Sequence, residues 1–494
     1  MNVLRTKSIE QSLEDTDDPE FKLKKKLTAV DLTVFGIGVV IGAGIFTLTG
    51  EVAADYAGPG VVFSFMIAAI CCALAALCYA EFASTVPVAG SAYTFSYATL
   101  GELVAWIIGW DLILELMLGA SVVAQGWSTY LVTFLDEIGL GWPDSIGPAD
   151  SEHFSWGHVN LAAVLLIAVL TTLIAVGIKE SLRVNLVLVG IKLFIVMFVI
   201  VAGLFYVSGA NYHPFIPPAS DPISGSGLTQ PLIQWAFGIE PQTFGVLGVI
   251  SAASVVFFAY IGFDVVATTA EEARDPQRDL PKGIIFSLLI CTALYVAVAL
   301  VITGMVPYDK IDPSAALATA FRDVGKSGFA TLISAGAVAG LTTVVMTLII
   351  GAVRVLFAMS RDGLLPHAFG KTSPTTGTPV RITVTIGVAV AVIAGFTPID
   401  KLEEMVNIGT LTAFTLVSIA IPVLRRSRPD LERPFRVPLS PVLPIVSALV
   451  CVYLMLNLSI ETWLRFLVWM VLGFVIYFAY GHSHSRVREV EKAR

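Results

Sequence analysis

The chain has 494 residues, of which 56% are hydrophobic and 14% are charged, and its formal net charge is −8. Charged residues make up about 25% of a soluble globular domain, so this composition excludes an ordinary soluble protein and indicates an all-α polytopic membrane protein. The basic residues are scattered at loop edges rather than gathered on one face, which argues against nucleic acid as a partner.

Apolar runs along the chain predict about twelve transmembrane helices, because about 20 helical residues span a bilayer. The loops are too short to fold as soluble domains, so we expect one transmembrane domain over residues 31–480. A polar cytoplasmic segment (1–30) and a basic cytoplasmic tail (481–494) flank it. The candidate spans are 31–50, 60–84, 103–134, 159–178, 184–207, 246–270, 284–304, 329–358, 381–397, 404–424, 442–460 and 463–480.

The first span is rich in glycine, and its sequence from residue 35 to residue 46 is FGIGVVIGAGIF. Glycine costs a helix about 1 kcal/mol relative to alanine, so the helix can end at Gly42-Ala43-Gly44, and broken helix ends hold small charged substrates in transporters. Alternatively, Gly38 and Gly42 have the spacing by which an unbroken helix packs closely on a neighbour. This stretch alone leaves both interpretations open.

Lysine and arginine are divided unevenly between the two sets of loops. With twelve spans, most of them fall on the side that carries both termini, whereas the 135–158 and 208–245 loops contain neither residue. Cytoplasmic loops carry an excess of Lys and Arg, so both termini are expected to be cytoplasmic. The 208–245 segment is then an extracytoplasmic loop, with a short surface helix near Leu228–Phe237.

A second interruption is predicted in span six, where residues 256–264 read VFFAYIGFD. Span six lies five spans after span one and therefore enters the membrane from the opposite face. Two breaks at equivalent places in halves of opposite orientation indicate a 5+5 inverted repeat with two added helices.

Ionisable residues at membrane depth are costly and usually functional. Asp111 and Glu115 share one face of span three at i,i+4, where two carboxylates repel each other, so at least one is expected to be protonated. They could form a structural core or line the substrate path. Glu81 and Arg354 lie near cytoplasmic ends, where a local ion pair or snorkelling to the surface is the simpler explanation.

Lys192 lies well inside span five. A lysine removed from water binds its proton less tightly, so Lys192 could carry a proton, or it could snorkel toward the cytoplasmic edge marked by Arg183. Asp264 follows the span-six break, where it could contact a substrate amine, stabilise the unwound backbone or cap the next half-helix.

The sequence does not indicate a metalloprotein, an enzyme or a channel. The five cysteines lie inside apolar runs and form neither a disulfide framework nor a metal-ligand pattern. The chain has no nucleophile motif that would indicate an enzyme. A channel would call for a repeated carbonyl filter or charged ring, which two dissimilar breaks do not provide. We therefore expect neither a metal nor a cofactor.

A series of motifs recurs in a fixed order along the chain. They are Gly42-Ala43-Gly44-Ile45-Phe46, Tyr79-Ala80-Glu81-Phe82-Ala83, Pro87 with Gly90-Ser91-Ala92-Tyr93, Gly109-Trp110-Asp111, Phe258-Ala259-Tyr260-Ile261-Gly262-Phe263-Asp264, Glu271-Glu272 with Pro276, and Ser360-Arg361-Asp362-Gly363. From about residue 27 to 481 the chain thereby resembles the amino acid–polyamine–organocation (APC) superfamily, most closely bacterial members of its cationic amino acid transporter family. The 208–245 loop is longer than is usual in such relatives.

The resemblance implies an inverted-repeat fold and secondary active transport of amino acids across the plasma membrane by alternating access. Proton-coupled symport is expected, with a proton-independent exchanger or facilitator as the alternative. The substrate class, cationic or small and neutral, stays open, as does the oligomeric state. The only other partner implied is the lipid bilayer, with protons as the coupling ion.

The resemblance also assigns residues to roles. The substrate carboxylate would meet the N–H groups of the span-one break, and its amine would meet carbonyls of the span-six break. Lys192 would replace a sodium site as the proton-coupling residue. Independently of the resemblance, their charge at membrane depth makes Glu115 and Asp264 candidates for the polar lining. The substrate-binding positions implied are Ile41, Gly42, Ala43, Gly44, Phe258, Ala259 and Ile261.

Overall fold

The structure is a computed structural model that describes residues 27–85, 91–148, 158–177, 182–220, 227–239, 242–313, 315–366, 368–373 and 378–488. Most of the predicted 1–30 segment, Pro87 and Gly90 of the motifs, and residues 489–494 of the predicted tail lie outside this part. Within the described residues, eight helices are long and apolar enough to cross a membrane, and four shorter apolar helices occupy the remaining predicted spans. The predicted all-α polytopic fold is confirmed.

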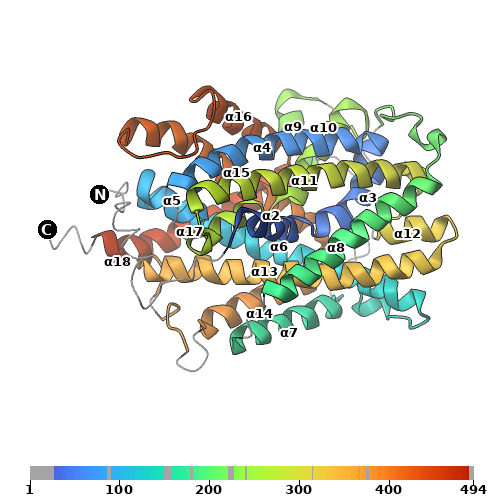
Figure 1. Cartoon of the computed structure of the whole chain (residues 1–494), viewed down its shortest axis with the longest axis horizontal. Coiled ribbons are helices and arrows are strands. Elements are labelled where there is room, and N and C mark those ends of the chain that lie inside the picture. The colour runs from blue at the N-terminus through green and yellow to red at the C-terminus, as the bar shows by residue number, and fades with distance from the viewer. Residues whose placement is uncertain are drawn as a thin grey trace.

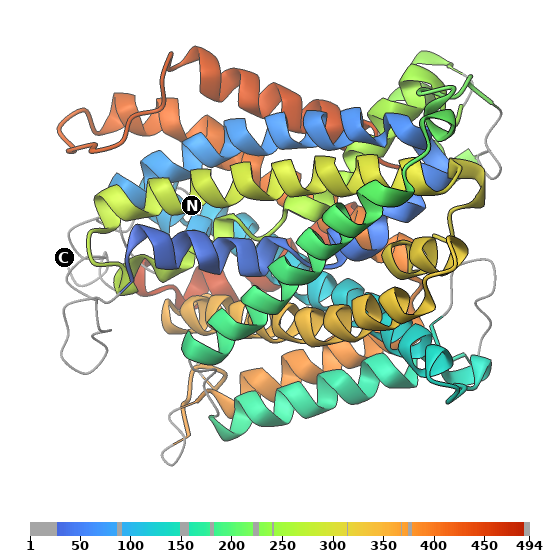
Figure 2. The same ribbon diagram turned by 45° about the vertical axis from the view of Figure 1, so that its right-hand side comes forward.

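The helices of the spans lie lengthwise along the molecule (Figure 1). α8 crosses the others obliquely, and α7 and α14 lie side by side at one edge (Figure 2). Their bounds are α2 Ala29–Val40, α4 Val61–Thr85, α6 Glu102–Glu137, α7 Leu161–Val176, α8 Leu182–Gly203, α10 Gly245–Val256, α11 Pro276–Met305, α13 Ser327–Arg361, α14 Val380–Phe396, α15 Ile399–Ser427, α16 Val442–Leu456 and α17 Ile460–Ile476.

Short helices connect or extend these spans. The 208–245 loop contains α9 within the stretch where a surface helix was predicted. The short elements used below are η1 Gly44–Leu48, α3 Thr49–Val52, η2 Ala53–Ala57, α5 Ser91–Thr99, α9 Leu232–Phe237, η8 Phe257–Tyr260, η9 Asp264–Glu272, α12 Ala316–Asp323, η11 Tyr477–Gly481 and α18 His482–His484.

Spans one and seven begin earlier than predicted. Thr28 caps α2, because its hydroxyl accepts the Asp31 N–H while the Asp31 carboxylate accepts the Thr28 N–H at 2.9 Å. α11 starts at Pro276 rather than near residue 284, since proline is well suited to a first helical turn. Its polar first turns hid this start from a search for apolar runs.

The two interrupted spans run in opposite directions. The start of α2 lies beside the start of α11, where the Arg274 N–H donates to the Leu27 carbonyl at 2.8 Å. The start of α10 lies at the other end of the molecule, where the Phe244 N–H donates to Tyr56 O at 3.0 Å, just after span one has ended. This opposite orientation is what the predicted inverted repeat requires.

An ion pair holds the C-terminal end of span two in place, and it confirms the local ion pair that was predicted for Glu81. The buried Glu81 carboxylate accepts the Arg425 Nε–H at 2.9 Å and the Val437 N–H at 2.7 Å. It thereby joins α4 to the end of α15 and to the 428–441 segment that follows. Arg354 is exposed on α13, consistent with a side chain that reaches the membrane surface.

Candidate substrate and coupling site

Span one is interrupted where the glycines predicted. α2 ends at Val40, and Ile41 leaves the helical conformation with ψ 89°. Helical geometry resumes at Ala43, and the next turn, η1, is a wide π-helical turn that begins at Gly44. The interpretation of span one as an unbroken packing helix is therefore wrong. The first N–H groups of its second half-helix, which begins at Ala43, have no partners within their own helix.

Span six is interrupted by a different backbone geometry. α10 narrows into the 3₁₀ turn η8, Ile261 is extended with ψ 136°, and Gly262 has φ +115°. Such a positive φ favours glycine, because a Cβ would clash with the backbone. Helical turns resume with η9 at Asp264, whose carboxylate lies beside the N–H groups of Gly262 and Val265. Asp264 is thus placed to stabilise the unwound turn.

The two interruptions are packed against each other in the interior. A Cβ added to Gly44 would lie 2.3 Å from Ala259 Cα, and one added to Gly262 would lie 2.6 Å from Val39 Cγ1. The start of η1 at Gly44 therefore lies against Ala259 in η8. The structure thus brings together the two sets of residues that the resemblance implies for substrate binding.

Buried side chains satisfy carbonyls that the breaks leave open. Tyr295 of α11 reaches both interruptions, with its hydroxyl 2.7 Å from the carbonyls of Val40 and of Ala259. Asn407 of α15 donates to the carbonyls of Ser254 at 2.8 Å and Val255 at 3.1 Å. Sequence reasoning missed both residues, although an asparagine at the depth of span ten is a signal that could have been used.

Lys192 does not snorkel to the surface. Its side chain is 1% exposed, and Nζ donates to the Gly38 carbonyl at 2.6 Å, in the last turn of α2 before the break. The lysine stem reaches this position by packing on Gly340 of α13, where a Cβ would lie 2.7 Å from Lys192 Cγ. Lys192 thus joins spans five and eight to the broken part of span one.

Buried carboxylates gather near the second interruption. Asp111 and Glu115 of α6 are 0% and 1% exposed, and Asp264 lies within electrostatic range of Glu115. Both Asp111 oxygens, one oxygen each of Glu115 and Asp264, and the Tyr79 hydroxyl have no hydrogen-bonding partner in the described part of the chain. Burying several negative carboxylates together without compensation is costly. Protons, a cation or the amine of a substrate would therefore have to neutralise them.

Metal-ligating side chains do not cluster in the part of the chain that the structure describes. No group of three or more His, Cys, Asp or Glu side chains there is arranged to hold a metal ion. All five cysteines are free and buried.

Comparison with known proteins agrees with this architecture. The sequence profile described as amino acid permease matches residues 27–477. The chain is 45% identical to the branched-chain amino acid permease BcaP of Bacillus subtilis (strain 168) over 99% of both chains. It is 44% identical to the methylthioribose transporter of the same organism, over 94% of this chain and 95% of that one.

A plant relative extends the comparison. The vacuolar cationic amino acid transporter 4 of Arabidopsis thaliana is 38% identical over 87% of this chain and 68% of its own length. The relatives are permeases and transporters rather than enzymes. With two opposed, interrupted spans and a profile match along nearly its whole length, this chain belongs to the amino acid permease family of the APC superfamily.

Proposed function

We propose that this protein is a secondary active transporter that moves amino acids across the plasma membrane by alternating access, with protons as the coupling ion. The observation that carries the proposal is the meeting of the two interruptions at Gly44 and Ala259. A zwitterion needs donors for its carboxylate and acceptors for its amine, and exposed half-helix ends supply both.

Each half of the zwitterion has its own place in this arrangement. The carboxylate would lie at the N–H groups of Gly42, Ala43 and Gly44, at the positive end of the second half of span one. The Ile41 N–H, also predicted to bind the carboxylate, instead donates to the Ile37 carbonyl at 2.9 Å. The amine would lie at the carbonyls of Phe258, Ala259 and Ile261. The Phe258 carbonyl also accepts the Ile261 N–H at 3.1 Å, and its second lone pair stays available to a ligand.

Proton coupling is assigned to Lys192. When charged, its ammonium holds the Gly38 carbonyl and with it the last turn of α2. Loss of the proton would weaken this charge-assisted bond and release that turn. The protonation of one side chain would thus be linked to the shape of the substrate site. Transport by exchange without protons is the alternative.

Names of relatives suggest which substrates to test. Close relatives are named for branched-chain amino acids, for cationic amino acids and for methylthioribose. A zwitterion site predicts amino acids rather than a sugar, because methylthioribose has neither a carboxylate nor an amine. A thermal-shift screen of the purified protein against the amino acids and methylthioribose should give shifts with amino acids. A shift with methylthioribose alone would overturn the proposed substrate class.

Counterflow in proteoliposomes tests the transport mechanism. Vesicles loaded with an unlabelled amino acid that binds should transiently accumulate the radiolabelled form, because a carrier exchanges substrates across the membrane. A channel or an enzyme gives no counterflow, so its absence with a bound amino acid would reject alternating access.

The orientation is proposed from charge. The end of the molecule that carries α18 and the starts of α2 and α11 is also the end where most basic residues lie, so it is assigned to the cytoplasm. Labelling of single cysteines in inside-out and right-side-out vesicles would test this assignment.

A further inference from the structure

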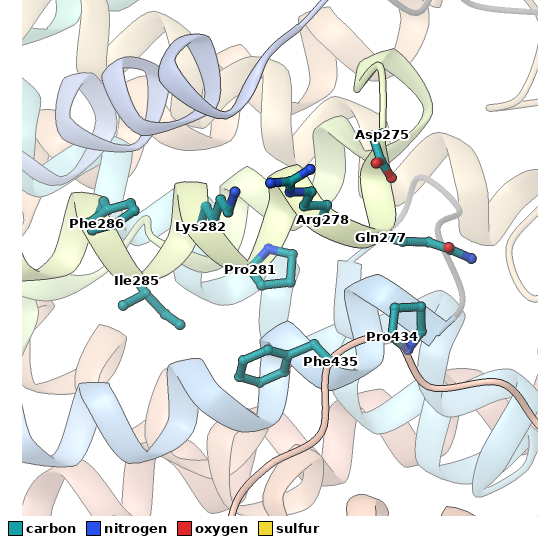
Figure 3. Close-up of a pocket in the computed structure, with 9 residues that line it drawn as sticks. All are labelled: Asp275, Gln277, Arg278, Pro281, Lys282, Ile285, Phe286, Pro434 and Phe435. Atoms are coloured by element: carbon teal, nitrogen blue, oxygen red, sulfur yellow. The ribbon is translucent and has the colours of Figure 1, made fainter.

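A groove lies at the basic end of the molecule, apart from the two interruptions. Its volume is about 560 Å³, and it separates the first turns of α11 from the segment that joins α15 to α16. The residues that line it are Asp275, Gln277, Arg278, Pro281, Lys282, Ile285, Phe286, Pro434 and Phe435 (Figure 3).

The rim of the groove is positively charged. Arg278 and Lys282 are four residues apart on α11 and therefore share a helix face, and Asp275 is the acidic residue of the lining. Within the described residues, neither basic side chain has an ion pair or a hydrogen bond to another side chain. Figure 3 shows both along one side of α11. Two cations without side-chain partners among the described residues offer charge complementarity to an anion.

Apart from Asp275 and Gln277, the rest of the lining is apolar and continues onto the exposed apolar surface of α11. Pro434 and Phe435 lie across from Pro281 and Ile285 (Figure 3). Phe286, which also lines the groove, is 51% exposed, and the next turn of α11 exposes Leu289 by 58%. A free phosphate ion would use only the basic rim, whereas a phospholipid would use both the rim and the apolar surface.

The groove is built by contacts elsewhere in the fold. Its far wall is fixed because the Val437 N–H, two residues after Phe435, donates to the buried Glu81 carboxylate at 2.7 Å. On the near wall, Pro281 lies inside α11 and cannot donate a hydrogen bond to the carbonyl of Gln277.

We propose that this groove binds the headgroup of an anionic phospholipid, with the phosphate at Arg278 and Lys282 and an acyl chain along Phe286 and Leu289. In the orientation proposed above, the lipid comes from the cytoplasmic leaflet. Basic pockets between transmembrane helices on that side are suited to anionic headgroups.

This site is connected to the transport machinery through one helix. α11 forms the near wall of the groove and also carries Tyr295, which reaches the carbonyls of both interruptions. A lipid that joins α11 to the 428–441 segment would therefore restrain the helix that holds the two breaks together. Anionic lipid is expected to change the rate of transport as well as the stability of the protein.

Thermal unfolding of the full-length protein in detergent tests the site. Phosphatidylglycerol should raise the Tm more than phosphatidylcholine or inorganic phosphate does. The double variant Arg278→Gln/Lys282→Gln should lose at least half of this increase. A matched control, Arg381→Gln/Lys371→Gln, removes two exposed basic residues at the same end of the molecule and should keep it.

Three results would overturn the proposal. They are an undiminished phosphatidylglycerol effect in the groove variant, an equal effect of phosphatidylcholine, and an equal effect of inorganic phosphate, which would indicate an anion site without a lipid. Amino acid counterflow in phosphatidylcholine vesicles is measured on the same proteins, so failure of the lipid site is distinguished from failure of transport.

Photo-crosslinking makes the test independent of variants. A phosphatidylglycerol that carries a photoreactive group near its headgroup should label the unmodified protein on peptides that contain residues 275–286 or 434–435. Labelling confined to other peptides would also overturn the assignment.

Discussion

Spans one and six are both interrupted in the middle, but the chain interrupts them in different ways. Span one stops because Ile41 leaves the helical conformation, and it resumes in the wide turn of η1. Span six first tightens into η8 and then reverses through Gly262, whose φ is +115°. In the proposed binding mode, the first break offers N–H groups to the substrate and the second offers carbonyls.

The supports of the two breaks also differ. Span one is held by a group that can change its charge, since Lys192 donates to the Gly38 carbonyl. Span six is held by the neutral amide of Asn407, which donates to two carbonyls at the end of α10. The comparison teaches that opposed, similar interruptions need not have equivalent roles. Here the proposed proton carrier, Lys192, supports the span-one break, whereas the span-six break is supported by Asn407 and, at its reversal, by Asp264.

The largest expected effect tests the contact between the breaks. Gly44→Leu should lower substrate affinity by about 100-fold or more, which corresponds to ~2.7 kcal/mol, because a Cβ there would lie 2.3 Å from the backbone of Ala259. Isothermal titration with an amino acid that binds would measure it.

A matched control separates this effect from damage to membrane insertion. Gly190→Leu places the same side chain on α8, at a glycine whose Cβ would have no neighbour within 4 Å. Both variants should insert, and the control should bind as the unmodified protein does. Near-normal affinity of Gly44→Leu would mean that the two interruptions do not form the substrate site.

The next largest effect tests whether Lys192, which supports span one, couples transport to protons. Lys192→Ala should abolish accumulation driven by a pH gradient while some exchange or binding remains, because the group that can release a proton beside span one is lost. Uptake in proteoliposomes with an imposed gradient would measure it, and Lys310→Ala, at an exposed lysine, is the control. Unchanged gradient-driven uptake in the Lys192 variant would remove the coupling role.

A smaller effect is expected where span six reverses. Gly262→Ala should lower affinity by about 10-fold, since an L-residue at this φ costs roughly 1–3 kcal/mol, and its Cβ would lie 2.6 Å from Val39 Cγ1. Combining it with Val39→Ala removes the steric contact but leaves the backbone strain. Full recovery in the double variant would show that crowding, rather than the conformation of Gly262, controls this break.

The sequence predicted the places of the interruptions better than their supports. Glycine leaves a local signal, so Gly42, Gly44 and Gly262 could be identified from the chain itself. Tyr295 is one of thirteen tyrosines, and its importance comes from carbonyls on two other spans. Such a hydrogen bond depends on helix packing between distant segments, which no local pattern encodes.

Burial was the second property that the sequence left open. Lys192 could equally well have pointed to the cytoplasmic surface, because its distance from Arg183 fits both alternatives. What decides its direction is Gly340 on α13, since the missing side chain there leaves room for the lysine stem. The position of Lys192 in the candidate site thus depends on a small residue of α13 that is remote from it in sequence.

The smallest expected effect concerns Tyr295, a side chain that reaches both breaks. Tyr295→Phe removes a hydroxyl 2.7 Å from the carbonyls of both Val40 and Ala259. A single hydroxyl hydrogen can be donated to one carbonyl at a time, so the loss should be about 1 kcal/mol, or about 5-fold in affinity. Because both breaks lose the same partner, binding should weaken while proton-driven accumulation persists. If accumulation is lost as completely as in Lys192→Ala, coupling would depend on the junction of the two spans, and the division of roles between them would fail.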